Sequence, residues 1–139
     1  MTKCALLLLL TLAPSAVVSA GMACIQVNPT HPTCADDVCL TVLACVPMVG
    51  TVTCTDWRVA TNGMIYLDIY VTYDPCQRGG STKINETFNV GDLCPGVHMV
   101  LARVHCSPGH CQPRYAVWAM GATVFKVSCA PCPQPQPQP

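Results

Sequence analysis

Cysteine density is the feature that most limits what this chain can fold into. The sequence holds 12 cysteines in 139 residues. Such a density is typical of small secreted domains that disulfides stabilise, whereas cytosolic thiols stay reduced and serve in metal binding or catalysis. The presence or absence of an export signal therefore decides how the cysteines are used.

The N-terminus has the features of a secretory signal peptide. Lys3 precedes an apolar run over residues 5–13, and Pro14 and several small residues follow. The run is too short to cross a membrane, which takes about 20 apolar residues. We therefore expect a secreted, extracellular protein.

Two positions satisfy the requirement for small residues at the cleavage site, one after Ala20 and one after Ala23. We expect cleavage after Ala23, which assigns residues 1–23 to the signal peptide. A bacterial lipoprotein signal at Ala23-Cys24 is disfavoured, because Gly21 stands where a branched apolar residue is required.

The mature chain is expected to form one disulfide-rich domain over residues 24–132. It keeps eleven cysteines, so one thiol stays free, pairs with another chain, or indicates that cleavage occurs elsewhere. Residues 133–139 alternate proline and glutamine and form an extended tail, since proline cannot donate to a sheet.

Charge excludes some partner classes. Seven basic residues balance seven acidic ones over the whole chain. Without a basic excess, we expect no nucleic-acid partner and no binding to anionic membranes. Nothing in the sequence calls for a cofactor.

Alternation of apolar residues predicts an all-β fold. The clearest strand covers residues 65–73, and residues 38–46 are apolar at both parities, as in a strand with both faces covered. Asn62-Gly63 indicates a turn before the first of these. Residues 51–55 are expected to form a strand that returns beside the strand at 38–46, and other strands are expected at residues 82–90, 97–104, 115–120 and 123–127. Six or seven short strands at regular spacing favour a barrel or a sandwich.

Four cysteines have zinc-ribbon spacing, C-x4-C-x17-C-x2-C: Cys106, Cys111, Cys129 and Cys132. An oxidising compartment favours disulfides instead, and Cys106 and Cys111 are expected to close their own turn. The Cys129–Cys132 pair also resembles a redox motif, but such thiols are activated at a helix N-terminus, and here a Pro-Gln tail follows.

We expect no enzymatic activity. The histidines do not gather in the sequence, and His98 and His105, which have odd separation on one expected strand, face opposite sides. His31 lies in a proline-rich stretch, and His110 lies in the expected turn. No serine lies in a nucleophile elbow and no carboxylate pair stands out.

The stretch from Cys24 to Val38, CIQVNPTHPTCADDV, resembles the start of the mature tissue inhibitors of metalloproteinases. Chains of that family open with a cysteine and reach a second cysteine and an Ala-Asp-x-Val sequence through Pro and His-Pro. Weaker likeness continues over residues 66–73, 87–97 and 99–103. The resemblance implies a netrin-like domain, a small disulfide-rich five-stranded barrel of the OB type.

Three departures limit this resemblance. Gln26 stands where the family has another cysteine, the segment leading to Cys34 is two residues short, and the family's C-terminal domain has no counterpart. The partner need not be the family's partner.

The resemblance implies a secreted inhibitor of extracellular zinc metalloproteinases. In the family, the amine and carbonyl of the first cysteine chelate the protease zinc and displace its water. Cys24 would take this role, Ile25 would enter the specificity pocket, and Asp92 and Leu93 would flank it. A disulfide from Cys24 to Cys94 would hold the terminus in place and lower the ordering cost of binding.

The alternative function is an extracellular binding or matrix module without inhibitory activity, in which Cys24 only attaches the terminus. Under either interpretation we expect a disulfide from Cys34 to Cys129 or Cys132. The Asn85-Glu86-Thr87 sequon predicts a glycan at Asn85 if the chain passes through a eukaryotic secretory route.

Overall fold

A computed structural model describes residues 21–109 and 115–129, and every element in this part of the chain is a strand. The strands are β1 (Ala23–Asn28), β2 (Val38–Val46), β3 (Gly50–Val59), β4 (Ile65–Tyr73), β5 (Thr82–Gly91), β6 (Gly96–Pro108) and β7 (Ala116–Val127). The all-β prediction is therefore confirmed.

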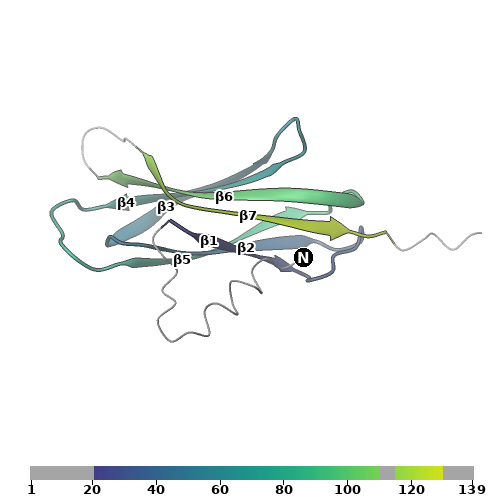
Figure 1. Cartoon of the computed structure of the whole chain (residues 1–139), viewed down its shortest axis with the longest axis horizontal. Coiled ribbons are helices and arrows are strands. Elements are labelled where there is room, and N and C mark those ends of the chain that lie inside the picture. Colours follow the sequence, from purple (N-terminus) through teal and green to yellow (C-terminus); the bar gives the residue numbers. More distant parts are fainter. Residues whose placement is uncertain (1–20, 110–114, 130–139) are drawn as a thin grey trace, which may run out of the picture.

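The strands form two sheets that lie face to face as two layers (Figure 1). One sheet has the order β1-β2-β5 and the other β3-β4-β6-β7. The strand at 51–55 was expected to return beside the strand at 38–46. Instead β3 belongs to the second sheet, so the Pro47–Met48–Val49 link crosses between the layers.

The five-stranded barrel is not confirmed. Seven strands are present, and the two sheets of the described residues do not close into a barrel. Along the side where β1 lies near β7, the strand pairing between the two layers is limited, in the described residues, to two isolated bridges, Met22 with Met120 and Thr33 with Ser128. The arrangement in these residues is a sandwich.

Alternation along the strands builds the core. In β2, every second residue from Val38 to Val46 is buried, while the residues between them are half-buried. Only one face of this strand is thus fully covered, because its other face is the outer surface of a two-layer fold. The β4 residues Ile65, Leu67, Ile69 and Val71 fill the core from the opposite sheet.

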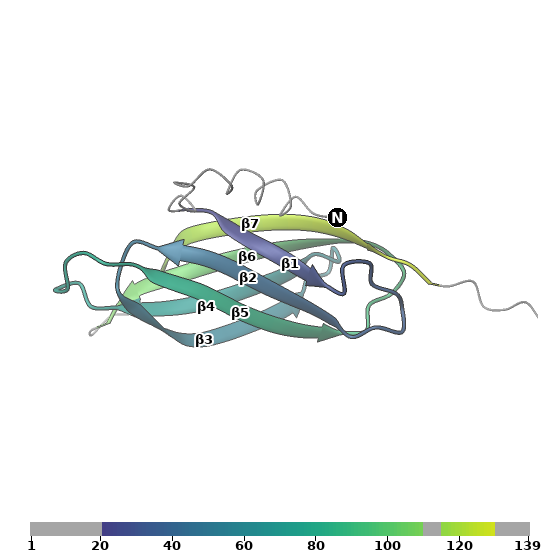
Figure 2. The same cartoon turned by 90° about the horizontal axis from the view of Figure 1, so that it is seen from below.

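The N-terminal end of the described chain is built into the fold beside β7 (Figure 2). The Met120 backbone N–H donates to the Gly21 carbonyl at 3.1 Å, and Ala23 is buried. Gly121 permits this contact: a Cβ at that position would collide with the Ala23 carbonyl group. The residues before Cys24 therefore take part in the packing.

Several element boundaries differ from the prediction. The strand β1 was not predicted, β7 is one strand where two were expected, and β6 continues to Pro108. The Asn62-Gly63 turn is confirmed, with Gly63 at φ 83° and the Met64 N–H donating to Asn62 Oδ1 at 3.0 Å. The Pro-Gln tail and Cys132 lie outside the described residues.

Candidate functional site

Asp92 and Leu93, two of the predicted protease-binding residues, line a groove at one end of the sandwich. The groove has a volume of about 410 Å³ and lies between the β3–β4 turn and the β5–β6 loop. Its apolar lining includes Val59, Met64 and Val97. The structure thus brings two of the four predicted residues together in one concave surface.

The other two predicted residues lie elsewhere. Cys24 and Ile25 belong to β1, where they are opposite Leu43 and Val42 of β2. The Ile25 side chain is only 3% exposed and packs in the core. It therefore cannot enter a partner's pocket unless it leaves the core, which corrects the role predicted for it.

The predicted disulfide between Cys24 and Cys94 is wrong, because Cys94 has a free thiol and Cys24 is bonded to another cysteine. Cys24 lies opposite Leu43, whereas the chain leaves β5 at Gly91, opposite Val38. Those β2 positions are five residues apart, about 16 Å at roughly 3.3 Å per residue. A disulfide requires Cα atoms within about 7 Å, so strand pairing keeps these cysteines apart.

An acidic pair lies beside the groove. Asp37 precedes β2 and Asp92 follows β5, so the pairing of Val38 with Gly91 brings their carboxyl groups together. A hydrogen bond with Asp92, followed by repulsion from its negative charge, raises the pKa of Asp37. The two carboxyl groups therefore interact directly at this end of the sandwich.

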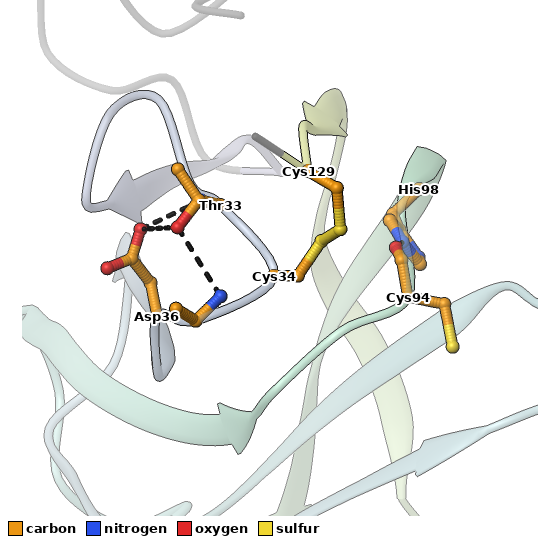
Figure 3. The surroundings of a disulfide bond; sticks show 7 residues. Thr33, Cys34, Asp36, Cys94, His98 and Cys129 are labelled. Atoms are coloured by element: carbon orange, nitrogen blue, oxygen red, sulfur yellow. Dashed lines mark hydrogen bonds between the residues drawn. A yellow bond between two sulfur atoms is a disulfide. The ribbon is translucent and has the colours of Figure 1, made fainter. Parts of the chain in front are cut away.

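The groove also contains a thiol and an imidazole, but they do not form a catalytic pair. The His98 Nε2–H donates to the backbone carbonyl oxygen of Cys94 at 2.7 Å. Figure 3 shows the Cys94 sulfur pointing away from the His98 ring. The imidazole is stacked on Phe125 at a centroid distance of 5.6 Å, so it is bound to the backbone and the core, not to the thiol.

The predicted disulfide from Cys34 is confirmed, with Cys129 as its partner (Figure 3). It joins residues 95 apart in the sequence, at a Cα–Cα distance of 5.2 Å. Adjacent backbone bonds support it: the Cys34 N–H donates to the Ser128 carbonyl at 3.2 Å. Because Cys129 is used in this bond, the four-cysteine zinc ribbon cannot form.

The predicted pairing of Cys106 with Cys111 is wrong. Cys106 is a buried free thiol of β6, and Cys111 lies outside the described residues. The turn was expected to begin at Cys106, but β6 continues beyond it, so the side chain points into the core. Burial raises the pKa of the Cys106 thiol to about 11.

Sequence reasoning missed a charged network on the outer face of the four-stranded sheet. Asp68 of β4 lies opposite Arg103 of the parallel strand β6. Arg103 donates from Nε to Oδ1 at 2.8 Å and from Nη2 to Oδ2 at 3.1 Å, and His105 donates from Nε2 to Oδ1 at 2.8 Å. Asp68 is only 5% exposed.

Burial alone would raise the pKa of the Asp68 carboxyl, but hydrogen bonds from Arg103 and His105, together with their positive charges, lower it below its usual value. Aromatic rings flank the network. Tyr70 stacks on His105 at 4.7 Å, and the Arg103 guanidinium lies 4.9 Å from the Tyr66 ring centroid. The network thus forms a continuous, internally satisfied layer.

One sequence signal could have located this network. Asp68 has the same parity as Tyr66 and Tyr70 in the clearest strand, and Arg103 has the same parity as His105 two strands later. What the sequence could not give is the parallel pairing of β4 with β6, because β5 separates them in the chain. The expectation that His98 and His105 face opposite sides is confirmed.

In the described residues, no three His, Cys, Asp or Glu side chains are grouped so as to hold a metal ion. Nor does any helix in these ranges have the length and apolarity needed to cross a membrane.

Comparison with known proteins gave no match. No protein-family model matches the chain, and no curated protein or solved structure is significantly similar to it. The fold and the contacts described above therefore carry the functional argument.

Proposed function

We propose that the chain is a secreted, disulfide-bonded binding module that does not inhibit metalloproteinases through Cys24. The observation that carries this proposal is the position of residues 21–23. Their backbone and the Ala23 side chain pack beside β7, where Gly121 has no Cβ to obstruct them. These residues belong to the folded domain, so signal cleavage after Ala20 suits this fold better than cleavage after Ala23.

Cleavage after Ala20 leaves Cys24 inside the chain. Its nitrogen is then an amide, which is not the free amine that the inhibitor mechanism needs to chelate zinc. Removal of residues 21–23 would also cost the hydrogen bond from Met120 to Gly21 and the burial of Ala23. The N-terminal residues thus support the module and weaken the case for the inhibitor.

The rest of the predicted inhibitory site gives the inhibitor little support. Asp92 and Leu93 lie at the groove, while Cys24 lies five β2 positions away and Ile25 packs in the core. The netrin-like barrel that the resemblance implies would be the scaffold of the competing interpretation. In the proposed module, a disulfide-bonded sandwich carries its binding surfaces on exposed faces and edges.

The test compares two secreted forms of the protein, one beginning at Gly21 and one beginning at Cys24. We expect the Gly21 form to be more stable by about 1–3 kcal/mol, from one backbone hydrogen bond and a buried alanine. We expect neither form to inhibit a panel of zinc endopeptidases. Inhibition by the Cys24 form at a one-to-one ratio, with both forms equally stable, would contradict the proposal and restore the inhibitor.

A further inference from the structure

We propose that two copies of the chain pair edge to edge through β3 to form a dimer with one continuous eight-stranded sheet. The inference goes beyond the proposed function and does not depend on where the signal is cleaved. Among the described residues, β3 pairs with no strand other than β4, so the backbone groups along its other edge have no strand partner. Such edges are templates for strand addition by another chain.

The part of β3 available for pairing is residues 54–59. A bulge between Val52 and Cys54 interrupts the strand, and bulges of this kind disturb pairing on the affected side. Beyond it, all six residues are exposed, and none is proline or lysine. In Figure 2 this strand runs along one long edge of the molecule.

Side-chain charge selects the pairing register. A twofold axis perpendicular to the sheet keeps the outer faces of the two copies on the same side. The axis must then pass beside one residue of β3, and that residue lies opposite its own symmetry mate. An axis at Asp56 would place the two Asp56 carboxylates opposite each other. An axis at Trp57 instead places Asp56 of each copy opposite Arg58 of the other, which forms two cross-strand ion pairs.

An axis at Thr55 is disfavoured for a different reason. It would draw the bulged region at Val52 and Cys54 into the pairing. The register centred on Trp57 uses only the regular segment and also pairs Thr55 with Val59 twice. Charge complementarity of the strand with itself therefore identifies a second copy as the occupant of this edge.

Contacts within one copy prepare the side chains for this arrangement. The Arg58 guanidinium lies 4.5 Å from the Tyr66 ring centroid, on the outer face of the sheet. The Trp57 backbone N–H donates to Asp56 Oδ1 at 2.9 Å. Trp57, which is 39% exposed, would meet its symmetry mate at the dimer axis, and tryptophan is enriched among residues that dominate interface energies.

The pairing closes at two copies. A twofold interface uses the same edge of both molecules, so dimerisation consumes both β3 edges. The opposite edge of the four-stranded sheet, β7, lies beside β1. Met120 within β7 bridges to Met22, and Ser128, just after β7, bridges to Thr33. A dimer, and not a fibre, is the expected assembly.

Sedimentation velocity of the secreted protein over a range of concentrations tests the proposal. We expect the wild-type protein to sediment as a dimer that dissociates on dilution. Arg58→Asp should weaken dimerisation at least tenfold, because it places acidic groups opposite each other. The double variant Asp56→Arg/Arg58→Asp restores opposite charges and should recover most of the lost affinity.

Three controls accompany these variants. Lys126→Asp reverses an exposed charge on β7 and should leave the dimer unchanged. Cys54→Ser removes the exposed thiol of β3 and should also leave the dimer intact, since the register centred on Trp57 does not need a disulfide. Asp56→Arg alone provides a second single reversal if Arg58→Asp fails to fold, as judged by thermal melting.

Three results would overturn the proposal. The first is a wild-type protein that remains monomeric at every concentration up to about 100 μM, well above the affinity range of specific complexes. The second is a dimer that Cys54→Ser abolishes, which would indicate a covalent link. The third is a folded double variant that dimerises no better than the single reversals.

Discussion

Asp68 shows how one buried charge organises the outer face of the four-stranded sheet. Its carboxylate accepts bonds from Arg103 and His105, and tyrosine rings cover both basic groups. A buried carboxylate without partners would be strongly destabilising, so these contacts allow the acid to occupy a position that is only 5% exposed.

The substitution Asp68→Asn removes the negative charge of the side chain and keeps its shape. Because the folded-state pKa of Asp68 is lowered, its carboxylate stabilises the fold at pH values above the unfolded pKa of about 3.9, and this contribution is lost as the pH falls through the folded pKa. We expect a loss of about 2 kcal/mol at pH 7, since charged hydrogen bonds contribute about 1.5–3. Urea unfolding from pH 7 to pH 2 measures the difference.

The matched control is Asp74→Asn, an exposed acid that accepts a bond from the Cys76 N–H at 2.9 Å. The amide oxygen of asparagine can accept the same bond, so its effect should stay within about 0.5 kcal/mol. An Asp68→Asn penalty that is the same at pH 7 and pH 2 would show that the charge is not the cause.

Thiol reactivity should separate the buried cysteine from the exposed ones. The Cys106 thiol is buried and its pKa is raised to about 11, so it stays protonated well above neutral pH. Cys54, Cys76 and Cys94 are exposed. Alkylation at pH 8 followed by peptide mass spectrometry should label free thiols at these three positions long before Cys106. Equal labelling rates in the folded protein would place Cys106 at the surface.

At the scale of elements, regular apolar patterns predicted strand boundaries well, whereas strands without such a pattern were missed or divided. β2 and β4 have the predicted boundaries, because β4 alternates over nine residues and β2 is a nine-residue, largely apolar run that ends before Pro47. β1 was missed because five of its six residues lie in the motif that resembled an inhibitor terminus, and Ala23 was assigned to the signal peptide. β7 was divided at Gly121, whose place within the strand depends on a close contact with Ala23 that the sequence does not reveal.

Gly121→Ala tests that contact. The added methyl would collide with the Ala23 carbonyl and force β1 away from β7, and overpacking of this kind costs about 1–3 kcal/mol. We expect this penalty in the chain that begins at Gly21 and a much smaller one in the chain that begins at Cys24, measured by thermal melting. Ala122→Val, an exposed neighbour, is the control.

A similar penalty in both chains would contradict the account, because the Cys24 form lacks the carbonyl that the methyl meets. The comparison therefore separates a contact with residue 23 from an intrinsic preference for glycine in β7. The backbone of Gly121 is not in the left-handed region, so alanine is conformationally acceptable there.

At the scale of the whole molecule, the order of strands in the two sheets shows that the fold is a sandwich and not a closed barrel. Sequence periodicity predicts strands but not their neighbours, because pairing joins residues far apart in the chain. The cysteines show the same limit. The bond from Cys34 to Cys129 joins two chain ends as expected. The predicted bonds of Cys94 and Cys106 are absent, because strand pairing holds Cys94 away from Cys24 and Cys106 is buried within β6.

The position of the sequon gives a further prediction for the whole molecule. Asn85 is exposed on β5, where it alternates with the buried residues Ile84 and Phe88. A glycan there would point away from the core. When the protein is expressed through a eukaryotic secretory route, glycosidase treatment should lower its mass, and Asn85→Gln should abolish the shift. An unchanged mass would show that the sequon is unused.

The mature N-terminus tests the central claim most directly, because the binding module and the inhibitor differ in whether Cys24 carries a free amine. Mass spectrometry of the N-terminal peptide from the secreted protein measures this without any assumption about a partner. The account predicts a chain that begins Gly21-Met22-Ala23, with Cys24 in a disulfide. A chain that begins at Cys24 would contradict it.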